Sequence, residues 1–135
     1  MNNKVYIHSS SLCETDNIGS HTKIGAFCII KSGVKIGKRC TVKDNVSIDS
    51  NIIIGDDVTI LSGTRLTGSI NIENHVVINE NVVFTSKNNI SIQPDALQKT
   101  KIMEWVSIGA NSTIENGLEI GKRVTVAPGS FVTKS

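Results

Sequence analysis

Aromatic residues, paired cysteines and long apolar runs are all scarce in this chain of 135 residues. Phe, Trp and Tyr make up only 4% of it, so its core must be aliphatic, which suits many narrow layers better than one large interior. Cys13, Cys28 and Cys40 are odd in number and form no CxxC pair, which argues against a disulfide framework or a zinc knuckle. No apolar run approaches the roughly 18 residues of a membrane span, and the N-terminus MNNKVYIHSS lacks the apolar segment of a signal peptide. We therefore expect a cytoplasmic protein without membrane insertion.

An excess of one charge is also missing. The 14 basic and 12 acidic residues leave a net charge of +2 and are spread along the chain, without the extended basic surface of a nucleic-acid-binding protein. The length and a hydrophobic fraction of 39% are ordinary for one domain, so residues 1–135 are predicted to form a single domain.

The sequence does contain a period of six. Twelve consecutive positions of this period carry a large apolar residue: Ile18, Ile24, Ile30, Ile36, Val42, Ile48, Ile54, Ile60, Leu66, Ile72, Ile78 and Phe84. A second set of inward-sized residues follows four positions after these marks: Thr22, Cys28, Val34, Cys40, Val46, Ile52, Val58, Thr64, Ile70, Val76 and Val82. A helix has a period of about 3.6 and a strand a period of about 2, so neither alone explains the pattern. A short strand followed by a corner does, and three such sides make a coil of about 18 residues in a repeat protein.

The corners leave their own signal in the sequence. A tight turn needs a residue that tolerates positive φ, first Gly and then Asn, Asp or His. Residues of this kind stand three positions after many marks: Gly33, Asn45, Asn51, Asp57, Gly63, Asn81, Asn111, Gly117 and Gly129. Packing and backbone signals agree in phase, which predicts an all-β parallel β-helix of about six coils.

The period fails at two places. Between Cys13 and Ile18 one hexad is a residue short. Residues 86–104 contain Pro94 and lack the corner pattern, so we expect a protruding loop near 86–104 that is functional, disordered or packed on a neighbour. The marks then resume at Ile108, Ile114, Ile120, Val126 and Val132.

The frequent Ile-Gly pairs, such as Ile36-Gly37 and Ile108-Gly109, resemble those of the hexapeptide-repeat acyltransferases. The segment IGANSTIENGLEIGKRVTVAPGSFVTK is similar to the last coils of bacterial acetyltransferases that modify nucleotide-linked amino sugars, and VTILSGTRLTGSINIENHVVINENVVFT resembles the subgroup acting on dTDP- or UDP-linked 3-amino-deoxyhexoses. This resemblance implies a left-handed β-helix, a homotrimer that holds acetyl-CoA between its subunits, and N-acetylation of a nucleotide-linked amino sugar for surface-polysaccharide biosynthesis.

The resemblance also implies where acetyl-CoA binds. Its pantetheine arm is expected along two stretches of small residues, which include Ser107, Gly109, Ala110, Thr125 and Ala127. Its phosphates need charge-assisted partners, which the basic residues of the last coils offer: Lys122, Arg123 and Lys134.

Acyl transfer to an amine needs an oriented acceptor, donors for the oxyanion and a destination for the proton. If the amine binds unprotonated, the departing CoA sulfur takes that proton, and otherwise a histidine is the first choice. His75 is the favoured catalytic residue, with Asn81 and Thr85 as hydrogen-bonding candidates. Each also has a structural explanation as a corner or strand residue. A step of 18 stacks four residues in one outward column: His21, Arg39, Asp57 and His75. This column is either a charge ladder or a device by which Asp57 orients His75.

Two other functions are open at this point, and a third is not favoured. O-acetylation of a sugar hydroxyl needs a true general base, because an alcohol is the weaker nucleophile. A non-catalytic scaffold is suggested by Ala26, Ser86 and Lys87, which depart from the residues common in relatives. A zinc enzyme of this shape needs three converging histidines, and His8 and His21 lie too far from His75 along the stack, so no metal is predicted.

Overall fold

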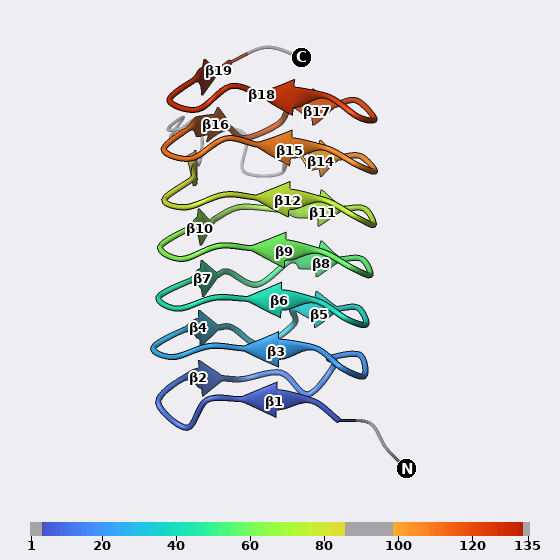
Figure 1. Cartoon of the computed structure of the whole chain (residues 1–135), viewed down its shortest axis with the longest axis vertical. Coiled ribbons are helices and arrows are strands. Elements are labelled where there is room, and N and C mark those ends of the chain that lie inside the picture. The colour runs from blue at the N-terminus through green and yellow to red at the C-terminus, as the bar shows by residue number, and fades with distance from the viewer. Residues whose placement is uncertain (1–3, 86–98, 134–135) are drawn as a thin grey trace, which may run out of the picture.

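The computed structural model describes residues 4–85 and 99–133, which form nineteen short strands wound into stacked coils (Figure 1). Sheet A contains β1 (Tyr6–Ile7), β3 (Lys23–Ile24), β6 (Thr41–Val42), β9 (Thr59–Ile60), β12 (Val77–Ile78), β15 (Ser107–Ile108) and β18 (Thr125–Val126). Sheet B contains β2 (Leu12–Cys13), β4 (Ile29–Ile30), β7 (Ser47–Ile48), β10 (Arg65–Leu66), β13 (Val83–Thr85), β16 (Thr113–Glu115) and β19 (Phe131–Val132). Sheet C contains β5 (Lys35–Ile36), β8 (Ile52–Ile54), β11 (Ile70–Ile72), β14 (Thr100–Ile102) and β17 (Glu119–Ile120).

All strand pairs are parallel, and the chain visits the three sheets in turn. Val42 pairs with Ile60 and Ile60 with Ile78, so one coil consists of three hexads, as the period predicted. In Figure 1 the strands of sheet A, in front, run to the left and those of sheet C, behind, run to the right while the chain climbs from N to C. The coils are therefore left-handed, which confirms the handedness implied by the resemblance.

The predicted inward residues form the core. Every mark from Ile24 to Phe84 is buried, as are all members of the second set, and the marks of the last coils become partly exposed at Val126 and Val132. Thr22 is a polar residue in this core, but its hydroxyl has hydrogen-bond partners. It donates to the Gly37 carbonyl at 2.7 Å and accepts from the Cys40 amide at 3.0 Å. The apolar interior is thus a single column of aliphatic layers.

The two irregularities of the period have different outcomes. The short hexad is confirmed, because Leu12 pairs with Ile29, a step one position shorter than the regular step by which Ile18 pairs with Ile36. The loop prediction is partly wrong, because Thr100–Ile102 is strand β14 of sheet C and Ile102 is fully buried. Thr100 and Ile102 repeat the inward pattern of the coil below, so residues 99–104 belong to the stack. The rest of the predicted loop, residues 86–98, lies outside the described residues.

The predicted corners are confirmed by the backbone. All nine Gly, Asn and Asp residues named for the corners have positive φ, between 56° and 93°. Positive φ also occurs at other residue types in corner positions: His21, Phe27, Arg39, His75, Trp105 and Arg123. These larger side chains point outward in the same way as the smaller ones, so each edge of the prism carries a column of side chains.

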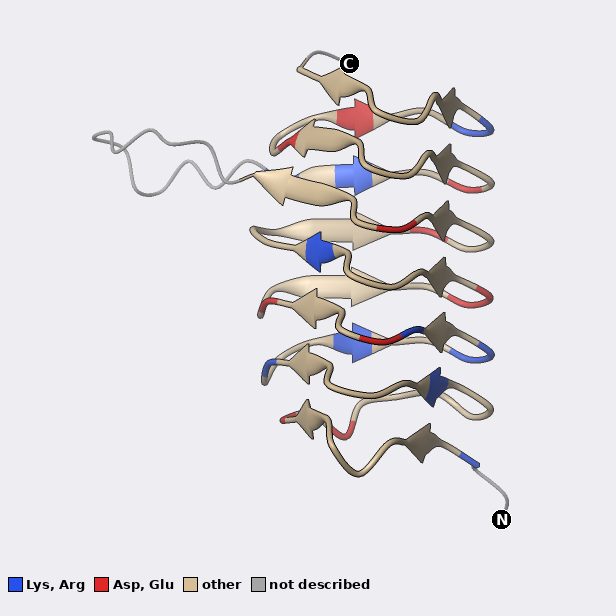
Figure 2. Ribbon diagram, turned by 60° about the vertical axis from the view of Figure 1, so that its left-hand side comes forward, with Lys and Arg blue, Asp and Glu red and all other residues tan. Residues whose placement is uncertain are grey.

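The surface charges are mixed, and Figure 2 shows Lys and Arg interspersed with Asp and Glu over successive coils. This distribution agrees with the absence of a one-signed surface in the sequence. Within residues 4–85 and 99–133 there is also no helix of the length and hydropathy that a membrane crossing requires.

The three free cysteines allow a simple test of the inward positions. Cys28 and Cys40 are each 1% exposed, and burial raises the pKa of both thiols, so they stay protonated near neutral pH and react slowly. Cys13 is half-buried. With a thiol reagent at pH 8, we expect one cysteine to react in the native protein and all three in denaturant. Rapid reaction of more than one thiol in the native protein would contradict the assigned inward positions.

Candidate functional site

Six side chains form one column at the corner between sheets C and A, which we call the His75 column: His21, Arg39, Asp57, His75, Trp105 and Arg123. Their φ angles all lie between 57° and 66°. Each amide donates to a carbonyl of the preceding coil, as from Asp57 to Lys38 at 2.9 Å and from His75 to Asp56 at 3.0 Å. Because the backbone repeats at this corner, successive Cα–Cβ bonds are parallel and neighbouring side chains meet.

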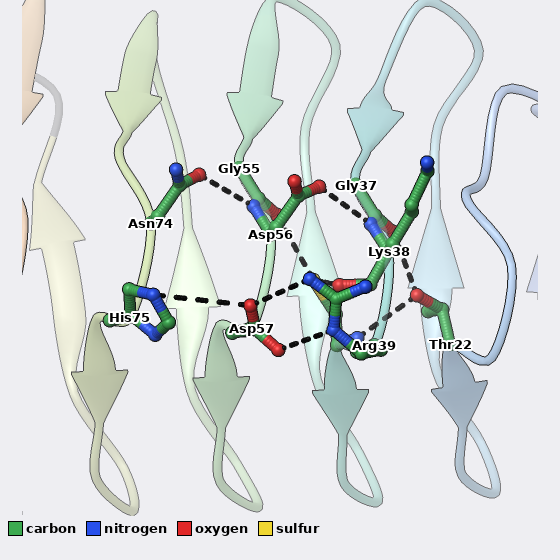
Figure 3. A network of polar contacts seen from close by, with 10 residues as sticks. Thr22, Gly37, Lys38, Arg39, Gly55, Asp56, Asp57, Asn74 and His75 are labelled. Carbon is green, nitrogen blue, oxygen red and sulfur yellow. Dashed lines mark hydrogen bonds and ion pairs between the residues drawn. The ribbon is translucent and has the colours of Figure 1, made fainter.

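A second ladder beside the column fixes the corner (Figure 3). The Asp56 carboxylate accepts from the Lys38 amide at 2.8 Å, and the Asn74 side-chain oxygen accepts from the Asp56 amide at 2.8 Å. These bonds use amides that the strand pairing leaves free. Asp56 and Asn74, each just before a residue of the column, therefore hold the coil below them.

Asp57 is bound mainly by Arg39. The Arg39 Nε donates to Asp57 Oδ1 at 2.8 Å and its Nη2 to Oδ2 at 2.9 Å, a bidentate pair that holds the pKa of the Asp57 carboxyl below its usual range (Figure 3). His75 Nε2 lies 4.0 Å from Asp57 Oδ2, which is ion-pair range and longer than a hydrogen bond. The predicted column is therefore present, but the Asp57 oxygens point to Arg39 rather than to the imidazole.

Trp105 is the residue that the sequence interpretation missed. Its ring stacks on the His75 ring with centroids 4.3 Å apart and an interplanar angle of 10°, and the Arg123 guanidinium carbon lies 5.9 Å from the centre of the Trp105 ring. Counting one regular coil from His75 does not reach Trp105, because the chain carries an insertion between these coils. Val77 accordingly pairs with Thr59 at the regular step but with Ser107 at a longer one. The mark at Ile102 would have revealed Trp105, which stands three positions later.

The predicted pantetheine residues lie together on sheet A of the last two coils. Ser107 pairs with Thr125, and the Gly109 amide donates to the Val126 carbonyl at 2.8 Å. Ser107 and Ala110 are half-buried, and Thr125 and Ala127 are exposed. Gly109 differs from them, because it is buried and a Cβ there would lie 2.4 Å from the nitrogen of Pro128. Its small size therefore serves the packing of the next coil rather than access for a ligand.

The predicted phosphate-binding residues stand at the entry to the same strip. Lys122 and Arg123 are exposed at the corner that precedes β18, and the Arg123 amide donates to the Glu104 carbonyl at 2.9 Å. Lys134 lies outside the described residues. Of the three predicted cations, Arg123 is thus the last residue of the His75 column and Lys122 is the residue before it.

Asn81 and Thr85 are not brought to His75 within one chain. Asn81 is at the corner between sheets A and B, where its amide donates to the Ser62 carbonyl at 3.0 Å. Thr85 ends β13 on sheet B. Residues six apart stand on successive sides of the prism, so the three predicted catalytic residues occupy three different places around it.

Metal ligands do not gather anywhere in the part of the chain that the structure describes. No three His, Cys, Asp or Glu side chains there are close enough to hold one ion. His8 instead accepts at Nδ1 from the Ser10 amide at 3.1 Å, in a local turn of the first coil.

Two family profiles match the chain by sequence. The family described as "Bacterial transferase hexapeptide (six repeats)" matches residues 17–50, and "Hexapeptide repeat of succinyl-transferase" matches residues 106–134. No curated protein matches the chain in a sequence search.

Solved structures with the same fold include two N-acyltransferases and a third protein, WeeI. AntD, an N-acyltransferase from Bacillus cereus solved with dTDP and coenzyme A, has 19% identity and a TM-score of 0.63, over 97% of this chain and 73% of its own. Perosamine N-acetyltransferase from Caulobacter crescentus, solved with CoA and GDP-perosamine, has 15% identity and a TM-score of 0.62, over 92% and 51%. WeeI from Acinetobacter baumannii AYE has 25% identity and a TM-score of 0.52, over 92% and 50%.

This chain thus spans about half the length of two of these proteins and 73% of AntD. At such identities, the likeness to AntD and to the perosamine enzyme establishes the shared fold. The repeats, the two family matches and the left-handed coils show that the chain is a left-handed β-helix built from hexapeptide repeats of the bacterial transferase type.

Proposed function

We propose that this protein transfers the acetyl group of acetyl-CoA to the amino group of a nucleotide-linked amino-deoxy sugar, with dTDP or UDP as the nucleotide. The observation that carries the proposal is the place of His75, whose side chain is 38% exposed at the corner leading into sheet A. The strip of small residues on sheet A and the cations Lys122 and Arg123 lie one and two coils further along. The N-acyltransferases of similar fold, whose structures contain CoA and nucleotide ligands, support this assignment.

The residues present fit acetyl-CoA as the donor. Ser107, Ala110, Thr125 and Ala127 offer a partly exposed backbone edge with little side-chain bulk, along which a pantetheine arm can lie. The exposed cations above this edge suit its phosphates. CoA supplies an activated thioester, and the chain supplies the surface that orients it.

The reaction needs no bound metal or redox partner. The acceptor nitrogen attacks the thioester carbonyl carbon, the new C–N bond forms, the C–S bond breaks, and the CoA sulfur leaves with the electron pair. The proton lost by the nitrogen passes to the departing sulfur, directly or through His75. Holding both reactants in line contributes about 7–11 kcal/mol in the best intramolecular cases, so orientation is the larger part of the catalysis.

We place the complete site between two subunits of a homotrimer. Asn81 and Thr85 stand on other sides of the prism from His75, so an acceptor site containing all three needs residues from a second chain. Cytoplasmic localisation and a role in surface-polysaccharide biosynthesis stay predictions of the sequence.

The direct test incubates the protein with acetyl-CoA and a panel of dTDP- and UDP-linked amino sugars and measures free thiol. We expect thiol release that depends on one of these acceptors. If none is acetylated and calorimetry detects no CoA binding, the proposal is wrong and the non-catalytic scaffold is correct.

The His75→Ala variant separates transfer to nitrogen from transfer to oxygen. General-base catalysis contributes roughly 10²–10⁴-fold, and an amine that binds unprotonated does not need it. We therefore expect kcat to fall only about tenfold with the amino-sugar acceptor, well short of that range. His21→Ala, in the same column but beside Arg39, is the matched control and should retain activity. Near-complete loss in His75→Ala alone would favour O-acetylation.

A further inference from the structure

The neighbours of His75 in its column differ in how they hold the imidazole. On one side is Asp57, whose two carboxylate oxygens are engaged by Arg39 at 2.8 and 2.9 Å. The 4.0 Å from Asp57 Oδ2 to His75 Nε2 leaves a nearby charge but no directional bond. Asp57 therefore does not fix the direction in which the ring nitrogens point.

On the other side is Trp105, which does constrain the ring. The two rings are nearly parallel, at 10° and 4.3 Å, and Arg123 stands over the Trp105 ring at 5.9 Å from its centre. The φ angles at His75 and Trp105 are 62° and 64°, so the two side chains leave the backbone in the same direction. Stacking is a preferred arrangement of aromatic rings, so this contact favours the orientation in which the imidazole plane lies parallel to the indole.

The backbone conformation of Trp105, with a φ of 64°, is energetically unfavourable. A bulky residue at positive φ is unusual, and such conformations persist where the surrounding structure imposes them, often at functional sites. Trp105 is the single tryptophan of the chain and is 51% exposed. Burial of its side chain therefore does not offset the conformational strain of its backbone. The contact that this position does provide is the stack on His75.

We propose that Trp105, rather than Asp57, is the positioning residue of His75. The indole holds the imidazole in one plane, so a ring nitrogen meets the acceptor amine within that plane. The charged groups around the pair are Asp57 with its partner Arg39 on one side and Arg123 on the other. The inference rests on the proposed function, because that function is what makes the direction of His75 matter.

The geometric half of the proposal is tested by NMR of the imidazole protons in the full-length protein. A ring stacked on an indole feels its ring current, so the His75 signals should be shifted upfield in the wild type. Trp105→Ala should return them to the positions of an exposed histidine, and Asp57→Asn should leave them shifted. His21, whose neighbour in the column is Arg39, gives signals that should not move in Trp105→Ala.

The functional half is tested by kinetics with the acceptor found in the panel. Trp105→Ala should lower kcat about as far as His75→Ala, with the KM for acetyl-CoA changed less than about twofold, and the double variant should be no slower than either single one. Trp105→Phe keeps an aromatic face and should recover most of kcat. Asp57→Asn should cost less than Trp105→Ala.

The outcomes distinguish this proposal from the proposed function. If Asp57→Asn lowers kcat as much as Trp105→Ala, or if Trp105→Ala leaves the His75 signals in place, the positioning role of Trp105 is wrong while acyl transfer stands. If the wild type acetylates no acceptor, the proposed function fails, and the NMR comparison still decides whether Trp105 or Asp57 fixes the ring. Thermal melting of each variant identifies any loss that comes from unfolding.

Discussion

The Phe84→Ala variant is expected to lose about 3–5 kcal/mol of its free energy of unfolding, because removing a large buried side chain leaves a cavity. Phe84 is fully buried and is among the largest side chains of the core. It lies in β13, where the strand pairs with β16 and the next coil depends on it. The loss should appear as a lower midpoint of urea unfolding.

Val83→Ala is the matched control for this variant. Val83 is the neighbour of Phe84 in β13 but points away from the axis and is half-buried. Its truncation should cost less than about 1 kcal/mol, the scale of strand propensity. Equal losses in the two variants would mean that the inward and outward sides of the hexad are assigned wrongly.

The second large effect is expected from a single added methyl group, in Gly37→Ala. A Cβ on Gly37 would lie 2.5 Å from the carbonyl oxygen of Gly55 and 2.3 Å from Oδ1 of Asp56. The Gly55 atom belongs to the backbone of the next coil and cannot rotate away. Overpacking of this kind costs about 1–3 kcal/mol and sometimes more. We expect a clear fall in the melting temperature.

Gly121→Ala is the matched control, because Gly121 follows Ile120 as Gly37 follows Ile36. A Cβ on Gly121 would meet nothing within 4 Å. This variant should be neutral or more stable by about 0.4–1 kcal/mol, because alanine restricts the unfolded chain. A stable Gly37→Ala protein would show that adjacent coils are further apart than the structure places them.

The coils could be predicted from sequence because each coil repeats the same two constraints. Ile48 and Ile60 face the axis for the same reason, and Asn45 and Gly63 turn the chain for the same reason, so one rule predicts every coil. The rule broke where the phase was lost. The step from Val77 to its partner Ser107 is longer than a regular coil, so counting by 18 fails across the insertion. The stack was predicted to resume at Ile108, although Ile102 is already an inward residue.

The same loss of phase left Trp105 out of the predicted site. His75 was predicted together with Asp57 because both lie on the regular side of the insertion. Trp105 lies beyond it, and its contact with His75 joins residues on opposite sides of that insertion. A period predicts which residues share an edge but not the rotamers, so the pairing of Asp57 with Arg39 also had to come from the structure.

Asn81 and Thr85 illustrate a different limit. Their spacing from His75 already places them on other sides of one prism, and only assembly can bring such residues together. Sequence periodicity describes one chain, so it gave no information about which edges of neighbouring chains meet.

The most direct test of the account is a crystal structure of the protein with CoA bound. We predict the pantetheine arm on sheet A of the last two coils, in contact with Ser107 and Thr125, with its sulfur toward His75 and its phosphates near Lys122 or Arg123. CoA bound on sheet B or C, away from the His75 column, would contradict the assignment of the site.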